Sequence, residues 1–166
     1  MAEISSTTPS LIPHIVCDGA AEAIDFYKQA FGAEELIRMP APNGKLMHAA
    51  ISIGGSMLML VDEMKEHGVL SPASLGGSPV TLHLNVANAD AAIDRAVAAG
   101  ATVTLAAHDA FWGDRYGQVR DPFGHNWSIA HPLRETVMSD SELLEAAKTA
   151  ACVGNEAASP AEPQNA

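Results

Sequence analysis

The sequence has few cysteines, few aromatic residues and little positive charge. Its two cysteines, Cys17 and Cys152, lie far apart in the sequence and do not suggest a disulfide framework, so we expect a reducing, cytoplasmic environment. Lys and Arg together number 9 against 20 Asp and Glu, which gives a formal net charge of −11. A nucleic acid partner is excluded because phosphate backbones require clustered basic residues. The negative field favours a cationic ligand.

The sequence also lacks a long apolar run. No stretch of apolar residues is long enough to span a membrane, so we expect no membrane partner. Residues 1–10 contain neither a basic residue nor an apolar segment, and they do not resemble a signal peptide. Both observations support a cytoplasmic location.

The apolar content of 48% is sufficient for a hydrophobic core, and the length is typical of one domain. A capping box at Ser139 and Glu142 predicts a helix near the C-terminus that packs on the domain or on a second subunit. The expected organisation is a flexible N-terminus (1–10), a single domain (11–132), a C-terminal helix (137–154) and a disordered tail (155–166).

The first half of the domain contains a strand, a helix and a hairpin. Residues 11–17 form an apolar strand candidate, and Asp18 is positioned to cap a helix that ends at Gly32. The segments 46–53 and 56–61 are joined by Gly54-Gly55, which is typical of a two-residue hairpin.

The same order recurs in the second half. Residues 80–86 form a strand, Asn88 caps a helix, residues 102–106 form a short strand, and residues 117–130 form a hairpin. An offset of 69 positions (83 minus 14) places five residues of each half on identical residues of the other. The matched pairs are His14 and His83, Ala20 and Ala89, Ala23 and Ala92, Ile24 and Ile93, and Asp25 and Asp94. This internal repeat indicates duplication of one structural module.

Several motifs, in this order and spacing, resemble the vicinal oxygen chelate superfamily. They are Ala-Ile-Asp-Phe-Tyr at 23–27, Phe-Gly-Ala at 31–33, Phe-Trp-Gly at 111–113 and Asp-Pro-Phe-Gly-His-Asn-Trp at 121–127. Within that superfamily, the sequence is most similar to the PhnB-like, glyoxalase/bleomycin-resistance branch. The resemblance implies an α+β fold in which two tandem βαβββ modules, 11–63 and 80–132, form a curved mixed sheet around a cavity. It also implies a homodimer.

Metal enzymes of this superfamily place two histidines and two carboxylates on defined strands. In this sequence the corresponding positions are Ile12, Thr81, Met59 and Ser128, none of which is a usual ligand for a divalent cation. We therefore expect no cofactor. His14 and His83 lie two residues along from the vacated histidine positions and are the candidates for a shifted divalent metal site. The resemblance thus implies either a metal-independent small-molecule binding protein or, as the alternative, a metal-dependent lyase, isomerase or dioxygenase.

Strand alternation predicts which side chains line the cavity. Trp112, Arg115 and Tyr116 belong to the densest aromatic and charged segment and are expected to contact the ligand, with Arg115 pairing an anionic group or Asp114. Trp127 is expected in the core. The predicted ligand is small, organic and partly aromatic or cationic, and no catalytic residue is assigned. The predicted ligand-binding residues are His14, His48, Met59, Thr81, His83, Asn85, Trp112, Arg115, Tyr116 and Ser128.

Overall fold

The structure is a computed structural model that describes residues 11–156. The elements in chain order are β1 (His14–Cys17), α1 (Ala20–Phe31), β2 (Glu34–Pro40), β3 (Leu46–Ile53), β4 (Ser56–Asp62), η1 (Lys65–His67), α2 (Pro72–Leu75), β5 (Thr81–Asn85), α3 (Ala89–Ala98), β6 (Thr102–Asp109), β7 (Asp114–Arg120), β8 (Asn126–Pro132) and α4 (Asp140–Glu156).

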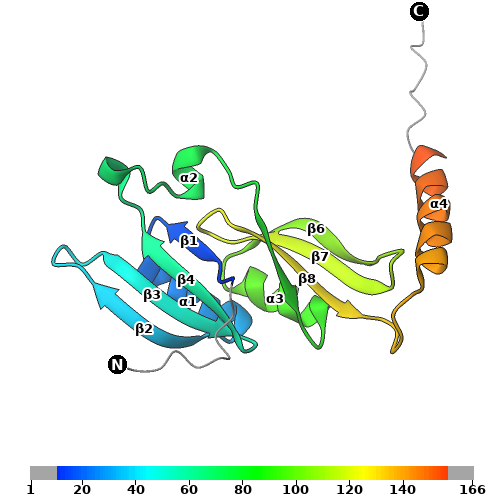
Figure 1. Ribbon diagram of the computed structural model, residues 1–166, viewed down its shortest axis with the longest axis horizontal. Coiled ribbons are helices and arrows are strands. Elements are labelled where there is room, and N and C mark those ends of the chain that lie inside the picture. Colours follow the sequence, from blue (N-terminus) through cyan, green and yellow to red (C-terminus); the bar gives the residue numbers. More distant parts are fainter. Residues whose placement is uncertain (1–10, 157–166) are drawn as a thin grey trace, which may run out of the picture.

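The strands form two separate four-stranded sheets, one from each half of the chain (Figure 1). The first sheet has the order β1-β4-β3-β2 and the second has the order β5-β8-β7-β6. In each sheet the strand before the helix pairs in parallel with the last strand, and the remaining pairs are antiparallel. Each half is therefore one βαβββ module, and the α+β fold with two modules is confirmed.

The boundaries of several elements differ from the sequence expectation. β1 begins at His14 rather than at residue 11, and β6 extends to Asp109 rather than ending at residue 106. The hairpin register is as expected, because Ser52 lies opposite Met57 across Gly54-Gly55. The 3-10 helix η1 and the short helix α2, which lie in the segment between the modules, were not predicted.

The two module helices are capped in different ways. Asn88 caps α3 as predicted, since its Oδ1 accepts a hydrogen bond of 3.0 Å from the backbone N–H of Ala91. The predicted cap of α1 by Asp18 is wrong. The Oδ1 of Asp62, at the end of β4, accepts hydrogen bonds from the N–H groups of Gly19 (3.1 Å) and Ala20 (2.9 Å) instead. A distant carboxylate thus replaces the local cap because Gly19, with φ 96°, turns the chain at this point.

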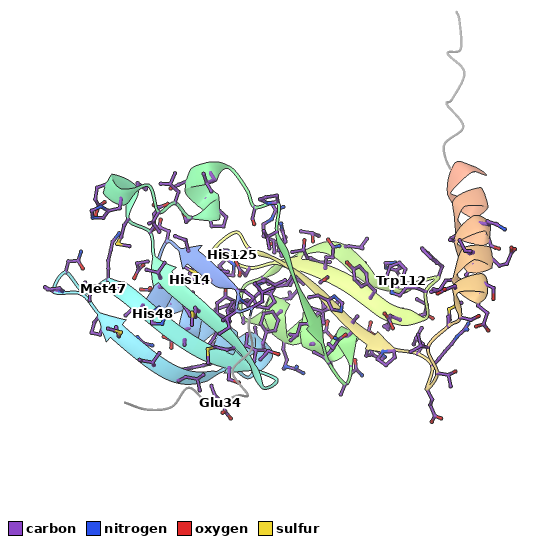
Figure 2. All side chains as sticks on the ribbon, in the orientation of Figure 1. His14, Glu34, Met47, His48, Trp112 and His125 are labelled. Carbon is purple, nitrogen blue, oxygen red and sulfur yellow. The ribbon has the colours of Figure 1, made fainter. Side chains whose placement is uncertain are left out.

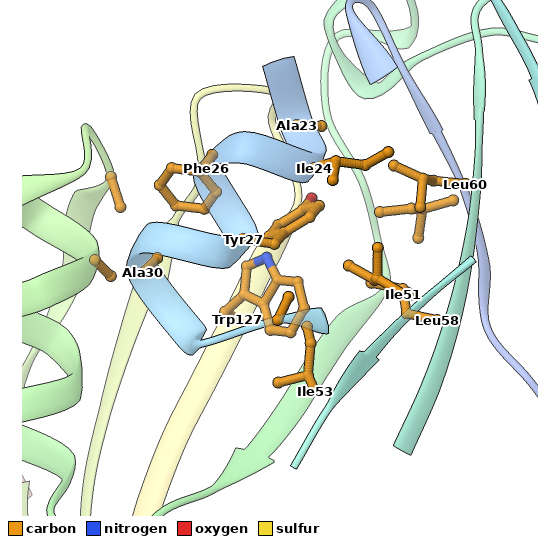
Figure 3. Close-up of a cluster of buried hydrophobic side chains, with 14 of the residues drawn as sticks. Ala23, Ile24, Phe26, Tyr27, Ala30, Ile51, Ile53, Leu58, Leu60 and Trp127 are labelled. Carbon is orange, nitrogen blue, oxygen red and sulfur yellow. The ribbon is translucent and has the colours of Figure 1, made fainter. Parts of the chain in front are cut away.

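The core lies between the sheets, where α1 packs against α3 and each helix also covers its own sheet. Figure 3 shows Tyr27 of α1 between the apolar side chains of the first sheet and Trp127 of β8. Trp127 is 4% exposed, which confirms its predicted core position. The Tyr27 and Trp127 rings lie 5.4 Å apart, so one aromatic cluster joins the modules.

A buried polar junction accompanies these rings. Asp121 Oδ2 accepts hydrogen bonds from the Tyr27 hydroxyl (2.7 Å) and the Trp127 indole N–H (2.9 Å). Its Oδ1 accepts from the backbone N–H groups of Phe123 and His125, which holds the predicted turn at 121–124. His125 Nε2 lies 3.1 Å from the Val16 carbonyl oxygen of β1. Asp121 and His125 therefore connect the second module to the first.

Helix α4 stands away from the two modules at the far end of the second sheet (Figure 1). It begins with the predicted capping box, because the Ser139 N–H and hydroxyl both donate to Glu142 Oε2 at 2.7 Å. None of the helices in residues 11–156 is both long enough and apolar enough to cross a membrane.

Candidate ligand-binding site

Each sheet has one face covered by its helix and one face turned away from it, which we call the open face. On the first sheet, the open face carries His14 from β1, His48 from β3 and Met59 from β4. Met59 is the cross-strand neighbour of His14, and the His14 and His48 rings lie 5.8 Å apart, edge to face (Figure 2). The three predicted residues of this module are thus brought together.

The open face of the second sheet is more polar. Thr81, His83 and Asn85 alternate along β5 and are exposed, whereas Leu82 and Leu84 face the helix side and are partly buried. Ser128 of β8 pairs in register with His83, and its Oγ lies 2.8 Å from His83 Nδ1. These four polar residues, predicted to line the cavity, therefore share one face.

Aromatic rings extend this face toward the β6–β7 turn. The Tyr116 ring stacks on His83 at 6.4 Å and 16°, and it meets the Trp112 ring edge to face at 5.3 Å. The His108 and Tyr116 ring centroids lie 6.1 Å apart in an edge-to-face arrangement, and the Tyr116 hydroxyl accepts a hydrogen bond of 2.7 Å from Gln118. We refer to His83, Tyr116, Trp112 and His108 as the aromatic platform. The sequence interpretation missed His108 and Gln118, although Gln118 lies two positions after Tyr116 and must share its face.

Arg115 lies on the opposite face of the second sheet. Its guanidinium pairs with Asp90 at the start of α3 at 2.8 Å and with Asp109 at 3.0 Å. The Arg115 side chain holds the pKa of Asp90 below its ordinary value through these hydrogen bonds. The predicted contact between Arg115 and Asp114 is not formed: Arg115 pairs with Asp90 and Asp109, and Asp114 accepts a hydrogen bond from the Trp112 indole N–H.

Two grooves lie between the modules. One, of about 360 Å³, is bordered by His14, Val16, Leu82 and the α2 segment. The other, of about 350 Å³, lies between the Gly54 hairpin and β5, and is bordered by Met57, Thr81, His83 and Asn85. His14 and His83 therefore face away from their helices, as alternation predicts, but they line different grooves of the single chain.

The chain matches the family model described as the Glyoxalase/Bleomycin resistance protein/Dioxygenase superfamily over residues 11–129. The chain belongs to this superfamily.

Individual proteins are similar to this chain in sequence or in fold. The protein Rv0887c of Mycobacterium tuberculosis is 53% identical over 135 residues, which cover 80% of this chain and 79% of that protein. The crystal structure of the Arabidopsis thaliana protein At5g48480 superimposes with a TM-score of 0.60 at 28% identity and covers 74% of this chain and 98% of its own. The PhnB protein of Bacillus cereus shares the fold, with a TM-score of 0.58 at 16% identity, covering 74% of this chain and 99% of that one.

Metals used in this superfamily do not fit the residues present here. Ser128, at one carboxylate position, is hydrogen-bonded to His83 Nδ1, and His83 Nε2 lies 3.1 Å from Asn85 Oδ1, so both ring nitrogens of His83 already have partners. Met59, at the other carboxylate position, offers a thioether to a site that needs anionic oxygen. Within residues 11–156, no three His, Cys, Asp or Glu side chains converge as a metal site.

Proposed function

We propose that this protein binds a small, partly aromatic ligand on the aromatic platform of the second sheet, without the metal site of its superfamily. The observation that carries the proposal is the arrangement of Tyr116, stacked with His83 and flanked by Trp112. Such rings accept a planar ligand by stacking, and the polar groups of Thr81, Asn85 and Gln118 are available to orient it.

The charge of the protein selects among planar ligands. The chain carries a net charge of −11, and Arg115, the cation next to Tyr116 in sequence, is paired with two aspartates on the opposite face. An anionic ligand would therefore meet no free cation on the platform. A neutral or cationic ring is favoured.

The binding experiment uses one ring with three charges: 2-naphthol, 2-naphthylmethylammonium and 2-naphthoate. Trp112 is 36% exposed and Trp127 is 4% exposed, so quenching of tryptophan fluorescence reports mainly on Trp112. Binding in the order cation, neutral, anion supports the proposal. Tyr116→Ala is expected to weaken binding by roughly tenfold, because one stacking contact is worth about 1–1.5 kcal/mol. Arg115→Ala, on the same strand but the opposite face, is the matched control and should leave binding unchanged.

A metal-dependent reaction is the competing function, and the His14 and His48 pair is the arrangement closest to a shifted site. We expect elemental analysis of protein purified without chelator to find less than one divalent metal ion per chain. A stoichiometric metal that disappears in His14→Ala or His48→Ala would refute metal-independent binding.

We also propose that the protein acts as a homodimer in the cytoplasm. In residues 11–156, no helix covers the open face of either sheet, and large apolar side chains such as Ile37 and Met39 of β2 are 46% and 45% exposed. A second subunit would cover this apolar surface and close the space in front of the open faces.

A further inference from the structure

Three side chains on the open face of the second sheet form a continuous hydrogen-bonded chain. Ser128 Oγ lies 2.8 Å from His83 Nδ1, and His83 Nε2 lies 3.1 Å from Asn85 Oδ1. The imidazole thus stands between a hydroxyl and an amide carbonyl. Ser128 is 4% exposed, whereas His83 and Asn85 are exposed at the edge of the sheet.

The proton positions in this chain follow from the partners. Asn85 Oδ1 can only accept a hydrogen bond, so His83 Nε2 carries the proton. In the neutral ring Nδ1 is then the acceptor, and the Ser128 hydroxyl must donate to it. The same contacts that make His83 a poor metal ligand therefore aim its basic nitrogen at a serine hydroxyl.

This order of groups is that of an activated nucleophile: a hydroxyl, a base that removes its proton, and a third group that fixes the base. We propose that Ser128 is a nucleophile that accepts an acyl group from a small aryl ester, with His83 as its base and Asn85 as the positioning residue. The inference rests on the platform proposed above as the ligand-binding surface, and it adds a reaction to binding.

The surroundings favour an aryl leaving group. Tyr116 stacks on His83 itself, so an aromatic ring bound on the platform lies beside the imidazole. The imidazole would protonate the oxygen of the departing aryl group. Gln118 is the direct cross-strand neighbour of Ser128, and it donates to the Tyr116 hydroxyl, whose own proton remains available. Gln118, opposite Ser128, and Tyr116, two residues before it on the same face of β7, are the donors that we assign to a developing oxyanion.

The reaction balances without an oxidant or a metal. Ser128 Oγ bonds to the acyl carbon as His83 Nδ1 takes its proton; the bond from the acyl carbon to the aryl oxygen then breaks, and that proton passes to the departing aryl oxide. In the second half, His83 removes a proton from water, the hydroxide bonds to the acyl carbon, and Ser128 leaves with the proton returned from Nδ1.

The test uses the full chain and 4-nitrophenyl acetate. We expect release of 4-nitrophenol to begin with a burst of about one equivalent per chain, and peptide mass spectrometry to find the acetyl group on Ser128. Ser128→Ala and His83→Gln should each lower the rate of release by at least about 100-fold. Ser141→Ala, which removes an exposed serine on α4, is the matched control and should change nothing.

Two variants separate chemistry from structure. Ser128→Cys keeps a nucleophile at the same place and should retain acetylation even if Ser128→Ala proves unstable. Asn85→Ala should slow acetylation, whereas Asn85→Asp, which keeps an oxygen acceptor for His83 Nε2, should restore it. A structural role alone would not produce this rescue.

Different results would contradict the nucleophile proposal and the ligand-binding proposal. Acetyl groups found on lysines or on other serines but not on Ser128, or release that is unchanged in Ser128→Ala, would overturn the nucleophile. If the naphthalene ligands still quench Trp112 in that case, the binding function stands. If they do not bind while Ser128 is still acetylated, the binding function fails and the nucleophile stands.

Discussion

A single buried carboxylate, Asp121, connects the two modules. It is 4% exposed and accepts hydrogen bonds from Tyr27 of α1, from Trp127 of β8 and from two backbone N–H groups of its own turn. Without this carboxylate, these four hydrogen-bond donors would be left without an acceptor. Such groups are costly because water cannot replace the missing acceptor.

Asp121→Ala is therefore expected to be among the most damaging single substitutions in the chain. We expect the free energy of unfolding to fall by about 3 kcal/mol or more, measured by urea denaturation. Asp109→Ala removes a carboxylate that is also bonded, to Arg115, but at an exposed position. It should cost less than about 1 kcal/mol. Equal losses in the two variants would contradict the role of Asp121 as a buried acceptor.

Two buried acids near this junction make the protein sensitive to alkali. Burial, and then the charge of Asp121, raise the pKa of the Cys17 thiol above its ordinary value of 9.0 and the pKa of the Tyr27 hydroxyl well above 10.0. Well below pH 9 both groups are protonated in the folded and the unfolded chain. As the pH rises further, only the unfolded chain releases these protons, and the free energy of unfolding falls by up to about 1.4 kcal/mol per pH unit for each group.

This dependence can be measured by urea denaturation between pH 8 and pH 11. The variant Cys17→Ala/Tyr27→Phe lacks both protons and should lose stability with a shallower slope than the natural protein, whatever its stability at pH 8. Parallel slopes would show that neither group retains its proton in the folded chain.

The helices α1 and α3 occupy equivalent places in the repeat but are stabilised differently. Asp62 is buried, and it binds three backbone N–H groups, those of Gly19, Ala20 and, through Oδ2, Leu46 at 2.6 Å. Asn88 caps α3 through one hydrogen bond at an exposed position. The charged, buried Asp62 also links β4 to β3, whereas Asn88 bonds only within its own helix.

We expect Asp62→Ala to lower the free energy of unfolding by about 3 kcal/mol and Asn88→Ala by about 1 kcal/mol. Circular dichroism during urea denaturation measures both. A loss for Asn88→Ala that equals or exceeds that for Asp62→Ala would show that the distant carboxylate adds nothing beyond an ordinary helix cap.

Most elements could be predicted from the sequence because their signals are local. Helical spacing and the terminal glycine identify α1, and Gly54-Gly55 fixes the β3–β4 register. β2 (Glu34–Pro40) escaped identification because it is an edge strand with charges at Glu34, Glu35 and Arg38, and because shifts in its pairing with β3 break the alternation. The Asp62 cap escaped as well, since it joins residues more than forty positions apart (62 minus 19).

The candidate site was predictable as far as strand alternation reaches. Strand alternation placed Thr81, His83, Asn85 and Ser128 on one face, where the structure brings them together. Arg115 was grouped with Tyr116 because the segment is dense in aromatic and charged residues. Adjacent residues of a strand face opposite sides, however, so the side chains of Arg115 and Tyr116 cannot both reach the same ligand.

The relation between the two sheets could not be inferred from the sequence of either module. β1 is an edge strand of the first sheet and β5 is an edge strand of the second. The hydrophobic pattern of the sequence does not decide whether these two edges pair with each other. In the structure the modules are joined through α1, α3 and Trp127, and the sheets remain separate (Figure 1). The open faces are consequently left to solvent or to another subunit.

Helix α4 is the element that extends farthest from this body, and Leu144 on its surface is 63% exposed. Leu143 and Ala147 lie on the same part of the helix and are partly buried. An amphipathic helix that covers little of its own chain is suited to cover a second subunit.

A chain that ends at residue 136 should therefore shift in light scattering from the mass of a dimer to that of a monomer. Leu144→Asp in the full chain should weaken the dimer in the same direction, because a carboxylate would have to be buried in the contact. Thr149→Asp adds the same carboxylate on the opposite, exposed face of the helix and is the control; it should leave the mass unchanged. If the shortened chain remains a dimer, the open faces of the sheets hold the subunits together without α4, and occupation of the aromatic platform would then depend on protein concentration.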